Sequence, residues 1–140
     1  MKVLFVCRGN VARSQMAEAI YNKITHSQDA DSAGTHVENP GETLGERKAR
    51  IGRSPVFDVM TDNGLRPDNK RQTQLTKSMV SHYDVVICMA GKKYTPKWLS
   101  NAPNYVYWKV NDPKARGYAY TDGARRRLEA KILELIRVKG

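Results

Sequence analysis

Apolar runs and helical stripes alternate along the chain. Residues 3–6 form a run of apolar residues, most of them β-branched or aromatic, which stops at a cysteine followed by a Gly-Asn turn and predicts a buried strand. From Arg13 onward, apolar residues recur at helical spacing, which predicts a helix ending near residues 26–27. A short strand over residues 31–35 completes a strand-helix-strand unit. Such a unit favours a right-handed crossover between parallel strands.

The rest of the chain continues this alternation. Ser54-Pro55 is typical of a helix start and Asn63-Gly64 of a helix end. A loop starts at residue 36, and we expect helices over residues 42–50, 54–63, 71–82 and 96–100. Strands are expected over residues 84–89 and 105–110. Thr121 or Asp122 is expected to cap a last helix. Because no hairpin signal interrupts the alternation, residues 1–140 are predicted to form one α/β domain, a three-layer parallel sheet with helices on both faces.

The loop after the first strand carries the candidate chemistry. Gly9 and Asn10 tolerate left-handed backbone, so successive N–H groups can converge on one anion, and the helix that starts at Arg13 adds its positive end. Cys7 lies at the mouth of this loop and should lose its proton readily, because the helix and the guanidinium stabilise a thiolate. Ser14 can donate a hydrogen bond to the sulfur. The loop therefore combines a nucleophile with a phosphate cradle.

A carboxylic acid is predicted at the same edge of the sheet. In open parallel sheets, ligands bind beyond the carboxyl ends of the strands, where the strand order reverses. The first strand leads to Cys7 at that edge, and the last strand leads to Asp112. The Asp112 side chain is thus expected near the thiol, where it can protonate a leaving oxygen and then activate water.

The sequence Cys-x5-Arg-Ser directly after a first strand resembles the signature of the low-molecular-weight protein tyrosine phosphatases and of their relatives, the thioredoxin-type arsenate reductases. Residues 32–35, 72–76, 83–89 and 111–113 also resemble this superfamily, in the family's order, so the resemblance covers essentially the whole chain. It implies a four-stranded sheet in the order 2-1-3-4. It also implies hydrolysis of phosphomonoesters, above all phosphotyrosine in proteins, through a phosphocysteine intermediate. The expected catalytic residues are Cys7, Arg13 and Asp112, and the expected substrate-binding residues are Arg8, Gly9, Asn10, Val11, Ala12 and Ser14.

Two other functions stay open. The loop exit, residues 13–18, resembles the arsenate reductase version, and arsenate fits the same cradle. Cys88 lies inside an apolar strand and is expected in the core, so a reductase would need an external thiol or a glutaredoxin-like partner to resolve the adduct on Cys7. The second alternative is a non-catalytic module that binds phosphate or nucleic acid. The presence of both Cys7 and Asp112 argues against that alternative.

Two departures from the family bear on the substrate. Ala12 stands where many family phosphatases have a second cysteine, so a protective disulfide with the nucleophile is not available. Lys114-Ala115-Arg116 follows the Asp-Pro pair where the family typically has aromatic residues, and Tyr118 or Tyr120 is the candidate wall for a phenyl ring. Arg8 adds a cation at the rim, which favours acidic or multiply phosphorylated substrates.

The composition adds expectations about partners. The chain has 24 Lys and Arg against 14 Asp and Glu, a net charge of +10, but only residues 125–127 form a compact basic run. We interpret this as a basic, soluble enzyme for which a nucleic-acid partner is not expected. The partner that the resemblance implies is a phosphorylated protein or a small phosphomonoester. No apolar run approaches 18 residues, so no membrane span is expected. A thiol that must stay reduced favours the cytoplasm, and no metal or other cofactor is expected because His26, His36 and His82 are isolated.

Overall fold

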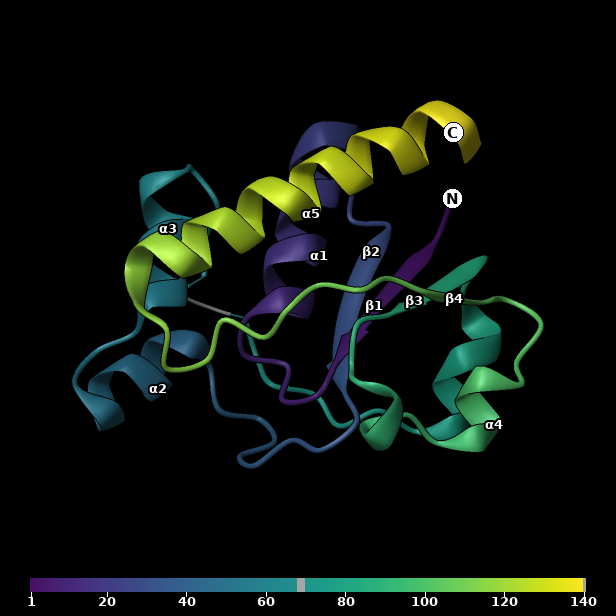
Figure 1. The fold of residues 1–140 in the computed structure, drawn as a ribbon, viewed down its shortest axis with the longest axis horizontal. Helices are drawn as coiled ribbons and strands as arrows, with labels where there is room; N and C mark the ends of the chain where they lie inside the picture. Colours follow the sequence, from purple (N-terminus) through teal and green to yellow (C-terminus); the bar gives the residue numbers. More distant parts are fainter. Residues whose placement is uncertain (68–69, 140) are drawn as a thin grey trace.

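The computed structural model describes residues 1–67 and 70–139. Within them one sheet consists of β1 (Val3–Cys7), β2 (Ala30–Gly34), β3 (Val85–Cys88) and β4 (Tyr105–Tyr107). The strand order is β2-β1-β3-β4 and every neighbouring pair is parallel (Figure 1). The predicted four-stranded parallel sheet in the order 2-1-3-4 is therefore confirmed.

Helices cover both faces of this sheet. The α-helices are α1 (Arg13–Thr25), α2 (Leu44–Ile51), α3 (Pro55–Asp62), α4 (Lys97–Ser100) and α5 (Gly117–Lys139), and two 3-10 helices are η1 (Lys77–His82) and η2 (Lys92–Tyr94). Helices α1, α3 and α5 lie together on one side, whereas α4 lies on the other (Figure 1). Among the described residues, no helix combines the length and the hydropathy needed to cross a bilayer.

The central strand β1 contributes to two cores because its side chains alternate between the faces. Phe5 packs with Met16 and Leu128 beneath α1 and α5. Leu4 and Val6 pack on the opposite face, in the cluster that holds Leu99 of α4. All five residues of β1 are buried, which explains why the strand is an uninterrupted apolar run in the sequence.

The predicted helix over residues 71–82 is wrong. Its first part is extended beside the end of β2, where the Gly34 N–H donates to the Thr73 carbonyl and the Leu75 N–H donates to the Gly34 carbonyl, both at 2.8 Å. A second bridge joins Arg71 to Thr43. Only Lys77–His82 turns, as the 3-10 helix η1. The backbone groups of residues 71–75 therefore pair with distant segments instead of with each other.

The last helix begins earlier than predicted. It starts at Gly117, so Thr121 lies within the first turns of the helix and does not cap it. The Thr121 hydroxyl donates to the Gly117 carbonyl at 2.8 Å. The last strand also ends early, at Tyr107, because the chain then leaves the sheet and presents the Val110 carbonyl to Arg13. By contrast, Ser54 caps α3 as predicted.

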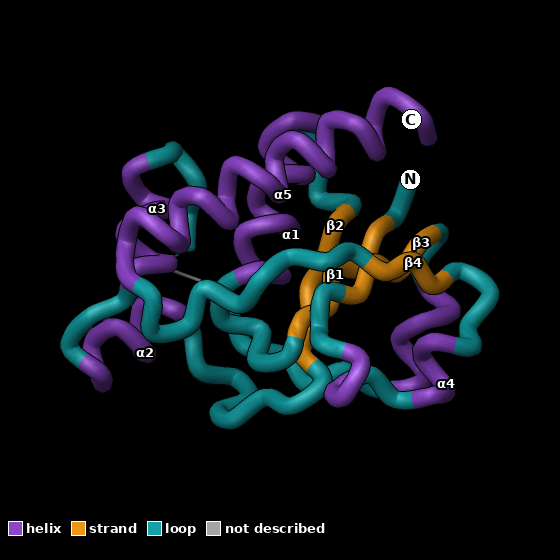
Figure 2. The backbone as a smooth tube through the Cα atoms, viewed as in Figure 1, coloured by secondary structure: helices purple, strands orange, loops and turns teal. Residues whose placement is uncertain are grey.

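The loops at the carboxyl ends of the strands gather at one edge of the sheet. The loops after β1, β2 and β3 lie below the sheet in the view of Figure 2, and the long segment after β4 crosses the view to enter α5. This segment contributes an ion pair to Arg13 at the end of the β1 loop. Residues about a hundred positions apart thus meet at one place.

Candidate active site

The loop after β1 wraps around the sulfur of Cys7. Asn10 has a φ of 57°, in the left-handed region that asparagine tolerates better than most residues. This conformation lets the Asn10 N–H donate to Sγ of Cys7 at 3.3 Å. The Ser14 hydroxyl lies 3.0 Å from the same sulfur, and the first turn of α1 begins at Arg13. The Asn10 N–H, the Ser14 hydroxyl and a helix N-terminus are therefore all directed at the sulfur of Cys7.

The Asn10 side chain holds this loop from behind. Its amide nitrogen donates to Oγ of Ser14 at 2.7 Å and to Oγ of Ser32 at 3.1 Å, and its amide oxygen accepts the Thr73 N–H at 2.7 Å. Asn10 and Ser14 are fully buried, and neither lines the pocket described below. In this structure their side chains support the loop, whereas the sequence suggested them as substrate contacts.

Arg13 is a buried guanidinium with one free edge. Nη1 donates to the carbonyls of Met89, at 2.5 Å, and Val110, at 3.0 Å, which fixes the plane of the group. Nη2 lies 3.6 Å from Oδ2 of Asp112. Nε is buried and has no hydrogen-bond partner among residues 1–67 and 70–139. Because a guanidinium offers five N–H donors in a fixed plane, the edge formed by Nε and Nη2 is available to two oxygens of an oxyanion.

Asp112 comes from the loop between β4 and α5. Its side chain is 41% exposed, and its Oδ1 accepts the Lys114 N–H at 3.0 Å. The carboxylate therefore lies beside Arg13 but remains open to solvent. Asp112 and Cys7 line the same pocket.

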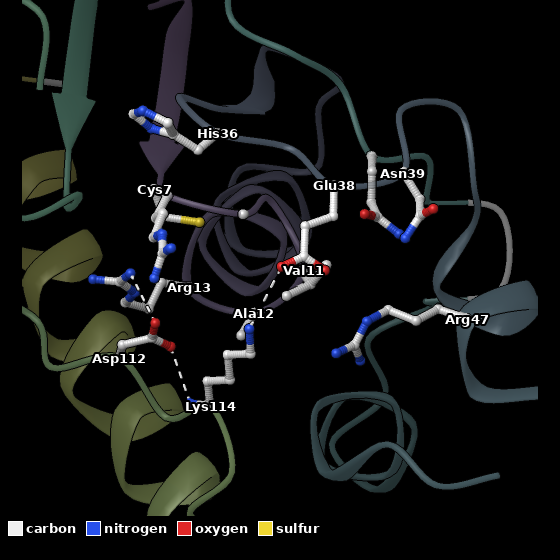
Figure 3. A pocket seen from close by; sticks show the side chains of 13 residues that line it. Cys7, Val11, Ala12, Arg13, His36, Glu38, Asn39, Arg47, Asp112 and Lys114 are labelled. Atoms are coloured by element: carbon white, nitrogen blue, oxygen red, sulfur yellow. Dashed lines mark hydrogen bonds and ion pairs between the residues drawn. The ribbon is translucent and has the colours of Figure 1, made fainter. Parts of the chain in front are cut away.

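That pocket is a cavity of about 50 Å³ above the loop. A buried water needs roughly 10–15 Å³ on the same measure, so the cavity has room for a group of a few oxygen atoms. Figure 3 shows Lys114 and Glu38 facing each other across the mouth, where Nζ and Oε1 are 3.8 Å apart. The lining consists of Cys7, Arg8, Gly9, Val11, Ala12, Arg13, His36, Glu38, Asn39, Arg47, Gln72, Asp112 and Lys114.

Sequence reasoning missed the far side of this pocket. Glu38, Asn39 and Arg47 come from the irregular segment after β2 and from α2, and no motif marked them (Figure 3). Neither Tyr118 nor Tyr120 is part of the lining. The Tyr118 hydroxyl instead donates to Asp62 of α3 at 2.6 Å, and the Arg116 guanidinium lies 4.9 Å from the Tyr120 ring. The expected tyrosine wall is therefore absent from the pocket.

Cys88 cannot reach Cys7. It pairs with Val6 in the sheet register, and its side chain belongs to the core on the opposite face from Cys7. Burial raises the pKa of the Cys88 thiol, which also approaches the Thr95 hydroxyl at 3.5 Å. In the described part of the chain, no group of three His, Cys, Asp or Glu residues is arranged to hold a metal ion.

Comparison with known proteins finds related sequences along most of the chain. The family model described as low molecular weight phosphotyrosine protein phosphatase matches residues 2–137. A low molecular weight protein-tyrosine-phosphatase of Streptomyces coelicolor is 34% identical over 95 residues, 63% of this chain and 52% of the relative. A low molecular weight phosphotyrosine protein phosphatase of Dictyostelium discoideum is 31% identical over 98 residues, 63% of this chain and 55% of the relative. The chain thus spans about half the length of these curated relatives.

A solved structure extends the similarity to the whole fold. The low molecular weight protein tyrosine phosphatase from T. tengcongensis superimposes with a TM-score of 0.79 at 25% identity, covering 98% of each chain.

Proposed function

This chain belongs to the low molecular weight phosphotyrosine protein phosphatase family, and on that basis we propose that it hydrolyses phosphate monoesters, phosphotyrosine in proteins above all. The observation that carries the proposal is the loop around Cys7. Its sulfur accepts the Asn10 N–H and contacts the Ser14 hydroxyl, at the base of a cavity that Arg13 borders with an unpartnered Nε. A nucleophile, a helix N-terminus and a guanidinium edge together suit attack on a tetrahedral phosphoryl group.

In the first step, the Cys7 thiolate attacks phosphorus in line with the leaving oxygen. The S–P bond forms as the P–O bond breaks, while the loop N–H groups and Arg13 neutralise charge on the three equatorial oxygens. Asp112, in its protonated form, gives its proton to the leaving oxygen, and its place in the lining of the same cavity as Cys7 supports this role.

In the second step, the Asp112 carboxylate takes a proton from a water molecule, which attacks the phosphorus of the phosphocysteine. The S–P bond breaks, inorganic phosphate leaves, and the thiolate returns to its two donors, Asn10 and Ser14. One carboxyl group therefore serves as acid in one half-reaction and as base in the other. We further propose that the enzyme works in the cytoplasm, where Cys7 stays reduced, and that an external thiol is needed if the chain reduces arsenate instead.

The test is hydrolysis of p-nitrophenyl phosphate and of a phosphotyrosine peptide by reduced protein without added metal. Cys7→Ser should abolish turnover and Asp112→Ala should reduce it at least a hundredfold. Cys88→Ser is the matched control, because this second thiol lies on the opposite face of the sheet, and we expect it to retain activity. A folded wild type without turnover would reject the proposal, and arsenate reduction with an external thiol would then be the assay to run.

A further inference from the structure

On one side of the pocket mouth, three side chains contact the aromatic ring of Tyr94. Tyr94, the last residue of η2, has the Arg8 guanidinium 4.2 Å from its ring centroid and the Lys93 ammonium 5.6 Å from it. The His36 ring packs edge-on against the same ring at 5.3 Å. Contacts of this kind hold cations in place over the ring face. We call the surface formed by Arg8, His36, Lys93 and Tyr94, together with Lys92, the first residue of the same 3-10 helix, the basic rim.

The basic rim is continuous with the cavity over Cys7. Arg8 and His36 line that cavity and at the same time contact Tyr94. Tyr94 follows β3 at the sheet edge where β1 ends in Cys7. A molecule whose phosphoryl group occupies the cavity therefore has its neighbouring atoms next to this surface.

The charge of the basic rim is not compensated within the described residues. Arg8, Lys92 and Lys93 are exposed, and none of them forms an ion pair in residues 1–67 or 70–139. The carboxylates that line the pocket, Glu38 and Asp112, face Lys114 and Arg13 instead (Figure 3). The mouth is thus cationic on the side of Tyr94 and mixed in charge on the other.

We propose that the basic rim binds acidic side chains next to the phosphorylated residue of a protein substrate. This inference rests on the proposed function and adds the substrate class. A short acidic flank matches a patch of three cations on one side of the cavity. A nucleic-acid backbone fits less well, because a continuous polyanion crossing the mouth would also meet Glu38, whose side chain is 76% exposed. The cavity, in addition, receives a terminal phosphoryl group, whereas internal nucleic-acid phosphates are diesters.

The test compares two phosphotyrosine peptides that differ only in their flanks, three Glu in one and three Gln in the other. The wild type should hydrolyse the acidic peptide with the higher kcat/KM, chiefly through a lower KM. Replacing both Lys92 and Lys93 by Ala should lower the acidic-to-neutral ratio about three- to tenfold, because exposed ion pairs contribute little each. Arg8→Ala should lower the same ratio by removing the cation nearest the cavity.

Lys131→Ala is the matched control. Its ammonium lies 5.6 Å from the Trp108 ring, the same distance as that of Lys93 from Tyr94, but it belongs to α5 and lines no part of the pocket. It removes one cation and one contact with an aromatic ring, so the acidic-to-neutral ratio should stay at the wild-type value. A fall equal to that of Arg8→Ala, which also removes one cation and one contact with an aromatic ring, would mean that net charge alone sets the preference, and the basic rim would be rejected.

Binding by Cys7→Ser protein separates this inference from the proposed function. Fluorescence anisotropy with the same two labelled peptides measures the preference without turnover, and the acidic peptide should bind more tightly by a factor that falls as salt increases. Equal affinities would overturn the basic rim even if the wild type is an active phosphatase. Tighter binding of the acidic peptide that is lost when Lys92 and Lys93 are also replaced by Ala would support the basic rim even if no turnover is seen. Displacement of the acidic peptide by an equal concentration of single-stranded DNA would overturn it in favour of a nucleic-acid partner.

Discussion

The two segments that supply the proposed catalytic groups are held in opposite ways. The β1 loop from Cys7 to Arg13 is fixed by buried polar side chains, above all Asn10, which makes three side-chain hydrogen bonds. The segment that carries Asp112 is exposed, and its carboxylate contacts only the Arg13 guanidinium and the Lys114 N–H within the described residues.

This difference matches what each group has to do. A nucleophile that attacks in line needs a fixed position relative to the oxyanion donors, and displacements near 1 Å can cost about a hundredfold in rate. A general acid that later acts as a base must reach a leaving oxygen in one step and a water molecule in the next. The buried network around Asn10 suits the first task, and the exposed segment around Asp112 suits the second.

The sharpest test of the contrast is Asp112→Asn. The amide cannot deliver a proton, so turnover should fall about 10²- to 10⁴-fold, most for substrates with poor leaving groups. Folding stability should stay within about 0.5 kcal/mol, because the side chain is 41% exposed. Steady-state kinetics measure the loss of turnover, and urea denaturation measures the folding stability. A loss of more than about 1 kcal/mol would show that the contact with Arg13 holds the fold as well.

Asn10→Ala should damage both properties. It removes the acceptor of the Thr73 N–H and one donor to each of the Ser14 and Ser32 hydroxyls, and it empties a fully buried side-chain position, so we expect a loss of about 2–4 kcal/mol in stability. Turnover should fall about a hundredfold as the loop loses its shape. Asn10→Gly is the control, because glycine restores the φ of 57° without the hydrogen bonds. If Asn10→Gly behaves like the wild type, the backbone conformation alone shapes the loop.

Gly34→Ala tests how tightly the loop is packed from below. A Cβ at this position would lie 2.8 Å from the Arg8 carbonyl oxygen and 2.9 Å from the Asn10 nitrogen, and these backbone atoms cannot move cheaply. We expect a loss of about 1–3 kcal/mol and about a tenfold fall in turnover, measured by denaturation and kinetics. Gly123→Ala in α5 meets nothing closer than 4.0 Å and should instead stabilise the protein by about 0.5–1 kcal/mol.

The β1 loop and the segment that carries Asp112 also differ in what could be predicted from the sequence. The β1 loop is local: a strand, a Gly-Asn turn and a helix start follow one another within fourteen residues, so the strand, the turn and the position of Cys7 follow from the pattern. The sheet order required the resemblance. The meeting of Asp112 with the β1 loop required only the rule that ligands bind at the carboxyl ends of parallel strands.

The errors concern segments shaped by distant partners. Residues 71–75 are extended because Gly34 and Glu42 supply backbone hydrogen-bond partners to this segment, and no local pattern encodes those pairs. Tyr118 was a candidate for the pocket wall, but Asp62, 56 positions away, binds its hydroxyl. Pocket residues such as Arg47 belong to segments where periodicity carries no information about which side chain points to the cavity. Sequence reasoning therefore places the β1 loop and Cys7 correctly and fails for the walls of the pocket, while the catalytic role of Cys7 stays a prediction.

The smallest predicted effect concerns the helix that follows the Asp112 segment. Asp122, in the first part of α5, accepts from Nε of Arg125 at 2.7 Å and lies 3.2 Å from Nε of Arg126. The hydrogen bond from Arg125 lowers the pKa of the Asp122 carboxyl below its ordinary value. A lowered pKa means that the folded state favours the carboxylate, so this stabilisation is present above about pH 4 and is lost as the pH falls through the folded-state pKa.

Asp122→Asn should therefore cost about 0.2–1 kcal/mol at pH 7, a value for a partly exposed ion pair, and the two proteins should converge in stability as the pH falls below about 4. Urea denaturation at several pH values measures the gap, with Glu134→Gln in the more exposed pair with Arg137 as the control. Turnover should not change, because Asp112 depends on Arg13 and not on this end of α5. A difference in stability that persists unchanged at low pH would assign the effect of Asp122→Asn to packing. A fall in turnover would mean that α5 positions Asp112.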